Sequence, residues 1–591
     1  MEKLSYRVLL RDYFWPQGWR LVWLGVLLAV NIGLQLWAPQ IMRDFLDVAL
    51  AEEGGSLTGM ALLFLVVAFS QQLAAVGATY VGENVGWIAT NQLRYDLARH
   101  CLYLDNRFHH THTPGEMIER IDGDINTLST FFARFVLQLV GNGILLVGIV
   151  LLLWWESVEM GGAITVFVIV AFLILVRFRN VAVPHWQASR EASSDYYSFV
   201  EEQLAGTEDV RANGAIPFVM YRFFELLRHF WQTTVRARLF AFGMTNLSWL
   251  MFAVGAYLSL GFGAQLYVDG VVTLGSVYLI FHYTTMLHQP MQRIVQEIET
   301  LQQAGAGVAR IRELSVYENQ LVAVAEPVAM PVTGLGIALE DVWFAYERAE
   351  GGEDWHWILR GVGCEVAEGK VLGLLGRTGS GKTTITRLLL RLYDLQKGSV
   401  KIGGIDVRQF DLRQLRQTVG IVTQTVELFH ASVRDNLTFF DAEIDDEAVV
   451  AAVEMVGMDE WLAGLPAGLD TVLVGSGGDL SAGQAQLLAM ARIFLKNPQI
   501  IILDEASSRL DPATEQRLER ALDKLLVGRT VIIIAHRLAT VARADEILIL
   551  EGGKVVEQGE REALLANPDS RLSALWRVGL ERWEMMEGDD G

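Results

Sequence analysis

The sequence predicts two parts of different fold class: an all-α membrane-spanning region of six helices, followed by an α/β domain. Three observations support this prediction. Of the 591 residues, 52% are hydrophobic and only 20% are charged, which is more apolar than an ordinary soluble protein. The long apolar runs all end by residue 291. Beyond residue 335, short apolar runs of the buried-strand type are interspersed with helical patterns.

Six apolar runs are candidates for membrane spans, because about 20 apolar residues are needed to cross the hydrocarbon core. Some of them include a few polar residues. The six runs are residues 21–40, 60–80, 135–155, 162–178, 239–267 and 274–291.

The links between these runs predict the topology. Those after the second and fourth runs are long and rich in arginine, whereas the others are short and poor in Lys and Arg. By the positive-inside tendency, both long links and both termini are cytoplasmic, in a multi-pass protein of the cell membrane. The arginines are Arg94, Arg99, Arg107 and Arg120 in one link, and Arg177, Arg179, Arg190, Arg211, Arg222, Arg228, Arg236 and Arg238 in the other.

Both long links read as helical hairpins with a short element at the tip. Their breaks lie at Thr113-Pro114-Gly115 and at Ala212-Asn213-Gly214, which predicts tips near residues 113–116 and 207–213. The second to fifth spanning helices therefore continue as long cytoplasmic extensions. Such tips could press on another domain, or they could simply be solvated ends of hairpins.

Polar residues inside the spans either face a cavity or bond to neighbouring helices. For any one of them, bonding between helices is the favoured interpretation. Our first candidate for a cavity-facing patch is His282 with the adjacent Tyr283, Thr284 and Thr285. The full set is Asn31, Gln35, Gln71, Gln72, Asn142, Asn246, His282 and His288.

We expect four segments along the chain. Residues 1–20 form an amphipathic helix on the membrane surface, and 21–317 form the transmembrane domain. Residues 318–334 form a linker, and 335–591 form the α/β domain. The formal charge of −21 argues against nucleic acid as a partner. Cys101 and Cys364 stand in unrelated contexts, which indicates reduced structural thiols.

The second half contains a complete phosphate-binding motif between a buried strand at 371–375 and an apolar helix at 385–392. Its glycines let the backbone wrap around phosphates. Lys382 is expected to reach the β- and γ-phosphates of ATP, and the Thr383 hydroxyl to bind Mg²⁺. The expected nucleotide-binding residues here are Gly376, Arg377, Thr378, Gly379, Ser380, Gly381, Lys382, Thr383 and Thr384.

Two further buried strands end in groups suited to ATP hydrolysis. The strand 500–503 is followed by Asp504, a Mg²⁺ ligand, and Glu505, which can polarise an attacking water. The strand 531–535 ends at His536, which is well placed to contact a γ-phosphate. Read singly, Glu505 or His536 could be ordinary loop residues; their order along the chain favours catalytic roles.

The segment Leu480-Ser481-Ala482-Gly483-Gln484, together with these motifs, makes the resemblance to one family specific. The chain resembles an ATP-binding cassette (ABC) exporter of the fused membrane-plus-cassette type over essentially its whole length. The resemblance implies that Ser481, Gly483 and Gln484 belong to the signature that contacts nucleotide. It also implies that Tyr346 stacks on adenine, that Gln424 is a Mg²⁺ ligand and a catalytic residue that reports on the attacking water, that 507–511 is the D-loop and that His536 is the switch histidine.

The family resemblance further implies a dimer of cassettes with two ATP molecules between them. Each site would join the phosphate loop of one chain to the signature of the other. The loop tips near 113–116 and 207–213 resemble the coupling helices that transmit cassette closure to the membrane.

Two departures from the family pattern lie close together. The signature has Ala482 where the family has glycine, and Gly475 stands where the family usually has glutamate. The groups expected to act on this chain's own ATP are intact, and the altered ones are those offered to the partner's ATP. This asymmetry favours a heterodimer with an unlike ABC half-transporter. The alternative is a homodimer in which Ala482 is a harmless change.

The predicted function is ATP-driven export of amphipathic small molecules, lipids or peptides by alternating access. Membrane lipid is the expected partner of the spanning helices. Two alternatives stay open at this point. One is import by the same architecture, and the other is an ATP-gated regulator or channel without active pumping.

Overall fold

The computed structural model describes residues 6–50, 57–317, 319, 321, 324, 326–347, 355–473, 480–504, 512–534 and 541–577. The chain divides into two compact units. The helical unit comprises Met1–Tyr103 and His112–Tyr317, and the α/β unit comprises Leu104–Thr111 and Glu318–Gly591. The short segment Leu104–Thr111 therefore lies with the second unit, which the sequence analysis did not anticipate.

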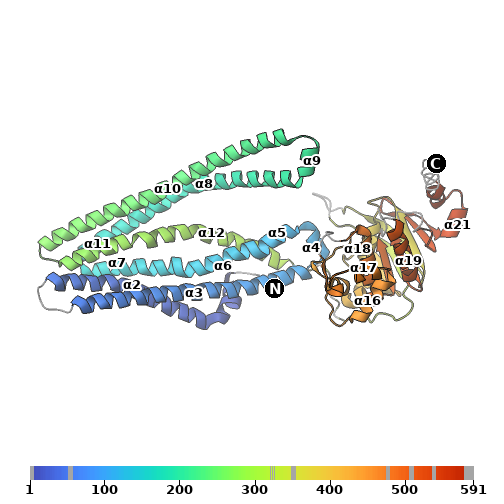
Figure 1. Cartoon of the computed structure of the whole chain (residues 1–591), viewed down its shortest axis with the longest axis horizontal. Helices are drawn as coiled ribbons and strands as arrows, with labels where there is room; N and C mark the ends of the chain where they lie inside the picture. Colours follow the sequence, from blue (N-terminus) through green and yellow to red (C-terminus); the bar gives the residue numbers. More distant parts are fainter. Residues whose placement is uncertain are drawn as a thin grey trace. The chain divides into compact units, whose positions relative to one another are not determined.

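Long helices dominate the helical unit, and Figure 1 shows α8 and α10 side by side with α9 joining their ends. α8 has 48 residues and α10 has 53, so both extend far beyond the roughly 20 residues that a span requires. The predicted helical extensions are therefore present. The long helices are α2 (Gly18–Leu50), α3 (Leu57–Tyr103), α7 (Gly141–Glu156), α8 (Val158–Ala205), α10 (Ile216–Val268), α11 (Leu274–Met286) and α12 (His288–Val316).

Shorter helical elements complete this unit. They are α1 (Tyr6–Leu9), η1 (Leu10–Phe14), η2 (Trp15–Gln17), α5 (Pro114–Ile118), η3 (Glu119–Asp124), α6 (Ile125–Arg134), η4 (Phe135–Val140) and α9 (Thr207–Ala212). Near the N-terminus, Phe14 is buried against Val85 and Ala89 of α3.

Five helices in the described part of the chain are long and apolar enough to cross a membrane. The sixth predicted run, 274–291, is divided at Leu287 into α11, of 13 residues, and the start of α12. Pro290 accounts for the division, because it has no N–H to donate to the carbonyl of Met286 and its ring crowds that carbonyl. Hydrogen bonds from Leu287 N to Tyr283 O and from Met291 N to Leu287 O carry the helical path across the break.

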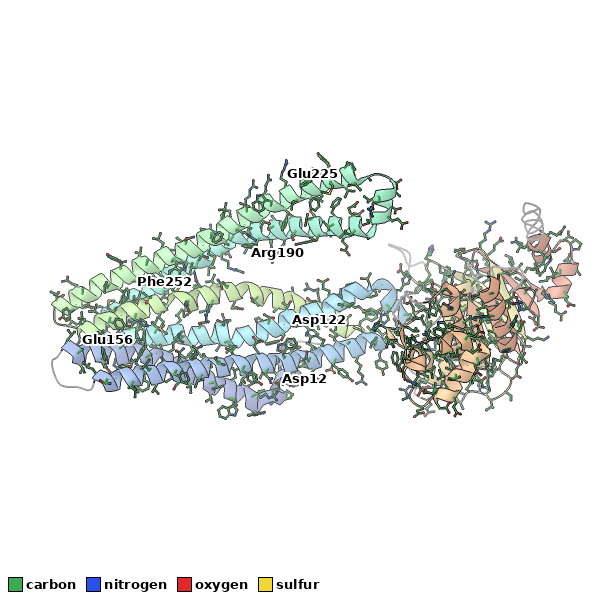
Figure 2. The ribbon with its side chains drawn as sticks, in the orientation of Figure 1. Asp12, Asp122, Glu156, Arg190, Glu225 and Phe252 are labelled. Carbon is green, nitrogen blue, oxygen red and sulfur yellow. The ribbon has the colours of Figure 1, made fainter. Side chains whose placement is uncertain are left out.

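The helical unit has a buried apolar core and an apolar exterior. Ile149, Leu175 and Met291 are fully buried in its core, whereas Phe69 and Leu258 are 67% exposed. Figure 2 shows Glu156 toward one end of this unit, with Asp122, Arg190 and Glu225 along the extensions. Large apolar side chains such as Phe69 and Leu258 face outward on the helices, as expected for contact with lipid.

Polar contacts tie three helices together near Glu156. Arg43 Nη1 lies 3.1 Å from Glu156 Oε2, which links α2 to α7. Asp47 accepts hydrogen bonds from Gly275 N and Thr273 Oγ1, both at 2.8 Å, which links α2 to the start of α11. A side chain at Gly275 would collide with Arg43 O, because its Cβ would lie 2.4 Å away.

Two sheets organise the α/β unit. The larger has six strands in the order β12-β11-β3-β10-β9-β6, and the smaller is antiparallel with the order β2-β1-β4-β5. In the larger sheet only β12 is antiparallel to its neighbour. Its strands are β12 (Lys554–Glu560), β11 (Glu546–Glu551), β3 (Val371–Gly376), β10 (Thr530–Ile534), β9 (Ile500–Asp504) and β6 (Val419–Val422). The smaller sheet has β1 (Ile337–Phe344), β2 (Leu359–Val366), β4 (Lys397–Ile402) and β5 (Ile405–Asp406), and β7 (Ala431–Ser432) pairs with β8 (Val472–Leu473).

One apolar core lies between the larger sheet and the helices α16, α18 and α19, and a second lies between the larger sheet, the smaller sheet and the helices α13 and α14. β9 and β10 are buried along almost their whole length, as a parallel sheet covered on both faces requires. The helical elements of this unit are α4 (Asn106–Thr111), α13 (Lys382–Leu389), η5 (Val407–Gln409), α14 (Leu412–Thr418), α15 (Val433–Thr438), α16 (Asp446–Met455), α17 (Asp459–Ala463), η6 (Gly468–Asp470), α18 (Ala482–Lys496), α19 (Pro512–Leu526) and α21 (Arg561–Ala566).

Candidate nucleotide site and membrane cavity

The parallel strands of the larger sheet bring the predicted site residues to one edge. Ile534 of β10 lies opposite both Leu374 of β3 and Asp504 of β9. Val422 of β6 lies opposite Leu503 of β9. The chain therefore leaves β3, β9, β10 and β6 at the same edge of the sheet, which is where α/β sheets place their ligands.

The loop after β3 has a backbone that requires glycine. Gly376, Gly379 and Gly381 have φ values of 149°, 81° and 105°. A Cβ on Gly376 would lie 2.3 Å from Leu550 O, and one on Gly381 would lie 2.5 Å from Leu359 Cδ2. Gly379 has no such neighbour within 4 Å. The loop thus packs closely on one side and is open at Gly379, which makes a cradle for a ligand.

Polar groups inside this loop suit a phosphate. Lys382 is only 6% exposed, and its Nζ donates to Gly376 O at 2.7 Å and to Arg377 O at 3.0 Å. Ser380 is buried, and its Oγ has no hydrogen-bond partner among the described residues. A buried hydroxyl without a partner and a buried ammonium at a helix N-terminus match the chemistry of a bound phosphate chain.

Two of the three predicted Mg²⁺ ligands lie together. The Thr383 hydroxyl donates to Asp504 Oδ2 at 3.4 Å, which joins the start of α13 to the end of β9. Gln424 is exposed two residues beyond the end of β6, the strand beside β9. These are hard oxygen donors of the kind that Mg²⁺ prefers, so the residues present fit that ion.

Tyr346, the predicted adenine-stacking residue, lies beside the phosphate loop. Its hydroxyl is 3.1 Å from Thr384 Oγ1, and it accepts a hydrogen bond from Arg387 Nη1 at 3.0 Å. Its ring meets Phe344 and Tyr393 edge to face, at centroid distances of 4.8 and 5.1 Å.

The segment that contains α4 packs around the same tyrosine. Arg107 Nη2 donates to Tyr346 O at 2.5 Å, and the His110 ring stacks on the Tyr346 ring with centroids 6.1 Å apart. The Tyr393 hydroxyl donates to Asn106 O at 3.4 Å. Sequence reasoning missed the roles of Arg107, His110 and Tyr393, because these contacts join positions more than 200 residues apart and have no local signal.

The predicted signature residues form the start of α18 and bond to one another. Ser481 Oγ accepts from Gln484 N at 3.2 Å, and Gln484 Oε1 accepts from Ser481 N at 2.9 Å, which is a capping box. Gly483 is buried and Ala482 is exposed. Within the described residues, no hydrogen bond joins this group to the loop that contains Lys382.

Arg492 of α18 holds the segment that follows Gln424. It donates to Asn436 O at 2.7 Å and to Glu427 O at 3.1 Å, and it lies 4.7 Å from the ring centroid of Phe439. Burial lowers the pKa of Arg492 to about 10. The sequence analysis did not single out this residue. A cavity of about 750 Å³ opens beside it, lined also by Thr423, Phe429 and Lys496.

Several predicted residues lie outside the described part of the chain. They are Glu505, the D-loop residues 507–511, His536 and Gly475.

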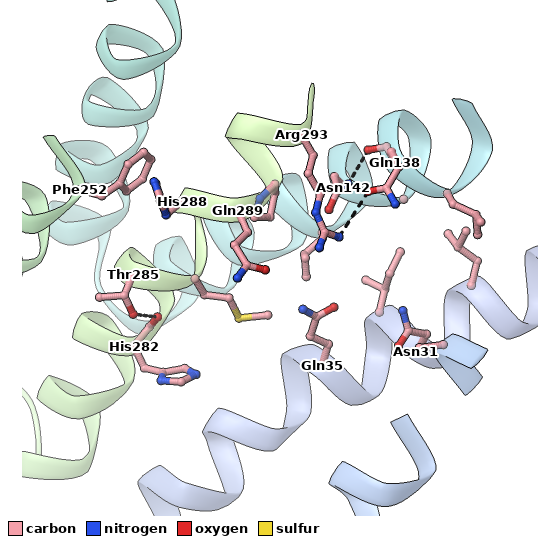
Figure 3. Close-up of a pocket in the computed structure, with 18 of the residues that line it drawn as sticks. Asn31, Gln35, Gln138, Asn142, Phe252, His282, Thr285, His288, Gln289 and Arg293 are labelled. Atoms are coloured by element: carbon pink, nitrogen blue, oxygen red, sulfur yellow. Dashed lines mark hydrogen bonds between the residues drawn. The ribbon is translucent and has the colours of Figure 1, made fainter. Parts of the chain in front are cut away.

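The helical unit contains a cavity of about 620 Å³, lined by residues from α2, α3, η4, α7, α10, α11 and α12. Five of the predicted polar residues line it: Asn31, Gln35, Asn142, His282 and His288. Figure 3 shows His282 and Thr285 on one side of it, and Gln35 and Asn31 on α2.

The other predicted polar residues of the spans do not line this cavity. The Tyr283 hydroxyl donates to Leu36 O at 2.6 Å, and that of Thr284 to Ile280 O at 2.8 Å. Asn246 donates within its own helix, to Phe242 O. Gln71 donates to Asn31, which is a bond between helices, and Gln72 is not among the lining residues. The predicted patch therefore reduces to His282 and Thr285.

Both units of the chain resemble known proteins. A family model described as the ABC transporter transmembrane region matches residues 21–291, and one described as ABC transporter matches residues 359–508. A probable multidrug resistance ABC transporter ATP-binding/permease protein of Bacillus subtilis is 32% identical over 486 residues, which cover 80% of this chain and 70% of that protein.

Two further likenesses extend over nearly the whole chain. An ATP-dependent lipid A-core flippase of Vibrio cholerae is 28% identical over 565 residues, which are 94% of each protein. A solved structure of a bacterial Atm1-family ABC exporter with ATP bound matches with a TM-score of 0.79 and 25% identity. That match covers 97% of this chain and 99% of the other.

Proposed function

Because the chain belongs to the ABC transporter family, we propose that it is one half of a dimeric pump that exports amphipathic compounds by alternating access. Family membership makes the chain a multi-pass membrane protein of the exporter type and an ATPase coupled to transport. Its nucleotide-binding domain is cytoplasmic. The dimer, the alternation and the substrate class are the parts that we propose.

The convergence of the Lys382 loop, Thr383 and Asp504 at one edge of the sheet carries the proposal for ATP hydrolysis. In it, Lys382 and the loop amides hold the phosphates, and Tyr346 holds the adenine. Mg²⁺, when bound by Thr383, Asp504 and Gln424, neutralises charge on the phosphates. Glu505 orients and polarises the attacking water, and His536 contacts the γ-phosphate.

The need for a second chain follows from the signature. Ser481, Gly483 and Gln484 lie at the start of a 15-residue helix whose N–H groups suit a γ-phosphate, yet no hydrogen bond among the described residues joins them to this chain's own loop. A second cassette that presents its signature to the Lys382 loop would complete each site. We propose that ATP closes this pair of cassettes and that hydrolysis reopens it.

We propose an unlike ABC half-transporter as the partner. Ala482 is exposed at the start of α18, so its extra methyl group is accessible to whatever the signature contacts in a partner. The altered signature would then serve the partner's ATP, while this chain supplies the hydrolytic residues of its own site. A homodimer with two equal sites is the alternative.

Coupling is proposed to run through the loop tips. The segment Leu104–Thr111 contacts Tyr346 and Tyr393, so closure around adenine would move α4 directly. The tip of the second loop is α9, with three charged side chains among its six residues, which suits a docking surface on a cassette.

Export is favoured over the alternatives by the relatives, which are named for multidrug resistance, lipid A-core flipping and export. These names support a substrate that is an amphipathic compound, and a lipid is one such compound. Neither import nor a gated channel without pumping draws support from them.

Substitution of Glu505 tests the pump. We expect E505Q to reduce steady ATP hydrolysis by at least about 100-fold, because an amide cannot act as a general base, while ATP still closes the cassettes. The measurements are ATPase activity and substrate loading of inside-out vesicles, with the exposed E562Q as a matched control that keeps both. Full transport by E505Q, or loading only in right-side-out vesicles, would contradict ATP-driven export.

A further inference from the structure

The cavity in the helical unit is lined by side chains of two kinds. Those that are aromatic or aliphatic, which we call the aromatic wall, include Trp249 and Phe252 of α10 and Leu28 and Ile32 of α2. Those with hydrogen-bonding groups that could contact a polar head, which we call the polar wall, are Asn31, Gln35, Gln138, Asn142, Gln289 and Arg293, so α2 contributes to both. This division suits a ligand that has both an apolar body and a polar head.

The charge on the polar wall is positive. Arg293 is the one permanently charged side chain among the lining residues, and no Asp or Glu lines the cavity in the described structure. Glu297, one turn farther along the same helix, is not among the lining residues and forms no ion pair with Arg293 in that structure. Arg293 therefore has no carboxylate partner among the residues that line the cavity.

Donor groups on this wall are available to a ligand. Arg293 has five N–H donors, and its hydrogen bond in the described structure is a long one, from Nη1 to Gln138 Oε1 at 3.3 Å. Gln35 and Gln289 have no hydrogen-bond partner among the described residues. Figure 3 shows Gln35, Gln289 and Arg293 around one space between α2 and α12.

Next to these donors, the side chains of Asn142 and Gln138 are already hydrogen-bonded to each other. Asn142 is 7% exposed, and its amide donates to Gln138 O at 2.6 Å and to Gln138 Oε1 at 3.1 Å. Gln138 Oε1 therefore receives donors from both Asn142 and Arg293. This arrangement holds the guanidinium at the cavity and leaves its other N–H groups for a ligand.

We propose that this cavity binds amphiphiles with an anionic head, a carboxylate or phosphate, and that Arg293 determines this selectivity. The inference rests on the proposed export function and names its substrate class. An anionic head gains charge-assisted hydrogen bonds from Arg293 and from the amides of Gln35 and Gln289. A cationic head of the same size is repelled by the positive charge of Arg293.

Matched fluorescent probes test the selectivity. They are dansyl-labelled alkyl chains of one length that end in a carboxylate, a phosphate monoester or a trimethylammonium group. Their Kd is measured by fluorescence on the full-length protein in phosphatidylcholine nanodiscs. We expect the two anionic probes to bind about tenfold more tightly than the cationic one, since a charge-assisted hydrogen bond is worth about that factor.

Substitutions on α12 distinguish the effect of the Arg293 charge from the effect of its packing. R293Q should remove the roughly tenfold preference, and R293K should keep most of it because the charge is retained. R312Q is the control, because Arg312 is also exposed on α12 but lies about 28 Å farther along the helix, outside the cavity. Equal affinities for all probes in the wild type, or an R293Q variant that keeps the preference, would overturn the inference.

Two further measurements identify which kind of anion the cavity binds. Inorganic phosphate should displace the probes only weakly, because it cannot use the aromatic wall; full displacement would contradict an amphiphile. Nanodiscs that contain phosphatidylglycerol should weaken probe binding if an anionic lipid is a ligand, and unchanged affinity there points to a soluble amphiphile. Loss of the charge preference would leave the E505Q test of ATP-driven transport unaffected, so the two failures are distinguishable.

Discussion

At the scale of single residues, the phosphate loop depends on glycine for two separate reasons. Gly379 and Gly381 both have a left-handed backbone, with φ of 81° and 105°. Only Gly381 also lies against a neighbour, because a Cβ there would be 2.5 Å from Leu359 Cδ2. The pair therefore separates backbone strain from steric overlap in one loop.

G381A should destabilise the α/β unit more than G379A. Both variants pay the left-handed strain of about 1–2 kcal/mol, and G381A adds overlap of about 1–3 kcal/mol against Leu359. Thermal unfolding of the purified protein checks the order, and ATP affinity reports whether the loop keeps its shape. Equal losses of stability in the two variants would show that Leu359 moves aside without cost.

At the scale of elements, α18 links the signature to the segment after Gln424. Its N-terminus carries Ser481, and Arg492 farther along it holds the backbone at Glu427 and Asn436. Asn436 is 1% exposed and itself bonds to Phe429 N and O. These hydrogen bonds join α18 to this segment, so we expect a movement of α18 to displace it.

R492K should loosen the segment between Gln424 and α15. Lysine keeps a charge but cannot reach both carbonyls, so we expect a loss of about 2 kcal/mol and faster hydrogen exchange over residues 424–432. R434K is the matched control, because Arg434 pairs with Asp446 in an exposed ion pair worth less than about 1 kcal/mol. Unchanged exchange in R492K would show that the contacts do not hold the segment.

The pKa of Arg492 also decides its pH behaviour. Burial lowers it to about 10, well below the ordinary value of an arginine, so folding disfavours the charged form. Because the guanidinium is charged in both the folded and unfolded states below about pH 9, its titration adds no pH dependence there. Stability linked to Arg492 would rise only as the pH passes above about 10, where the folded state has lost this proton and the unfolded state still holds it.

Elements with a strong local pattern were predictable. The buried runs that became β3, β9 and β10, and the helices that became α13 and α18, follow from apolar runs beside glycine-rich or capping sequences. Two others were misjudged through proline. Pro114 starts α5 behind the cap Thr113 instead of marking the tip, which is α4. Pro290 divides the sixth apolar run.

The site was predictable where chemistry is written in a short motif. The phosphate loop, Asp504 and the capping residues of α18 were recognised from such motifs, and so was the family, which the comparisons confirm. Arg107 and Arg492 were not, because their partners are backbone atoms brought near only by tertiary packing. Arg293 was missed for another reason: it lies just beyond the apolar run that was searched for polar residues.

At the scale of the whole molecule, one chain has two surfaces that are proposed to contact ATP, the phosphate loop and the signature. The two differ in how well they match the family pattern. The phosphate loop, Thr383 and Asp504 form a complete set for this chain's own ATP, whereas the signature carries Ala482. In a homodimer both sites would combine an intact loop with an altered signature. In a heterodimer only the partner's ATP would meet Ala482.

Native mass spectrometry of the complex, purified from its own membrane by a tag on this chain, separates these two arrangements. We expect one copy of this chain with one unlike ABC half-transporter. A482G should then change total ATPase activity less than about twofold, because it alters only the partner's weaker site, while loss of Lys382 by K382A should abolish most of it. A complex of two identical chains with full ATPase activity would establish the homodimer instead. So would an A482G variant whose ATPase activity is much higher while the complex keeps the same subunits. The reason is physical: the methyl group of Ala482 is exposed in the described structure, so a second chain that covers the signature would contact it directly.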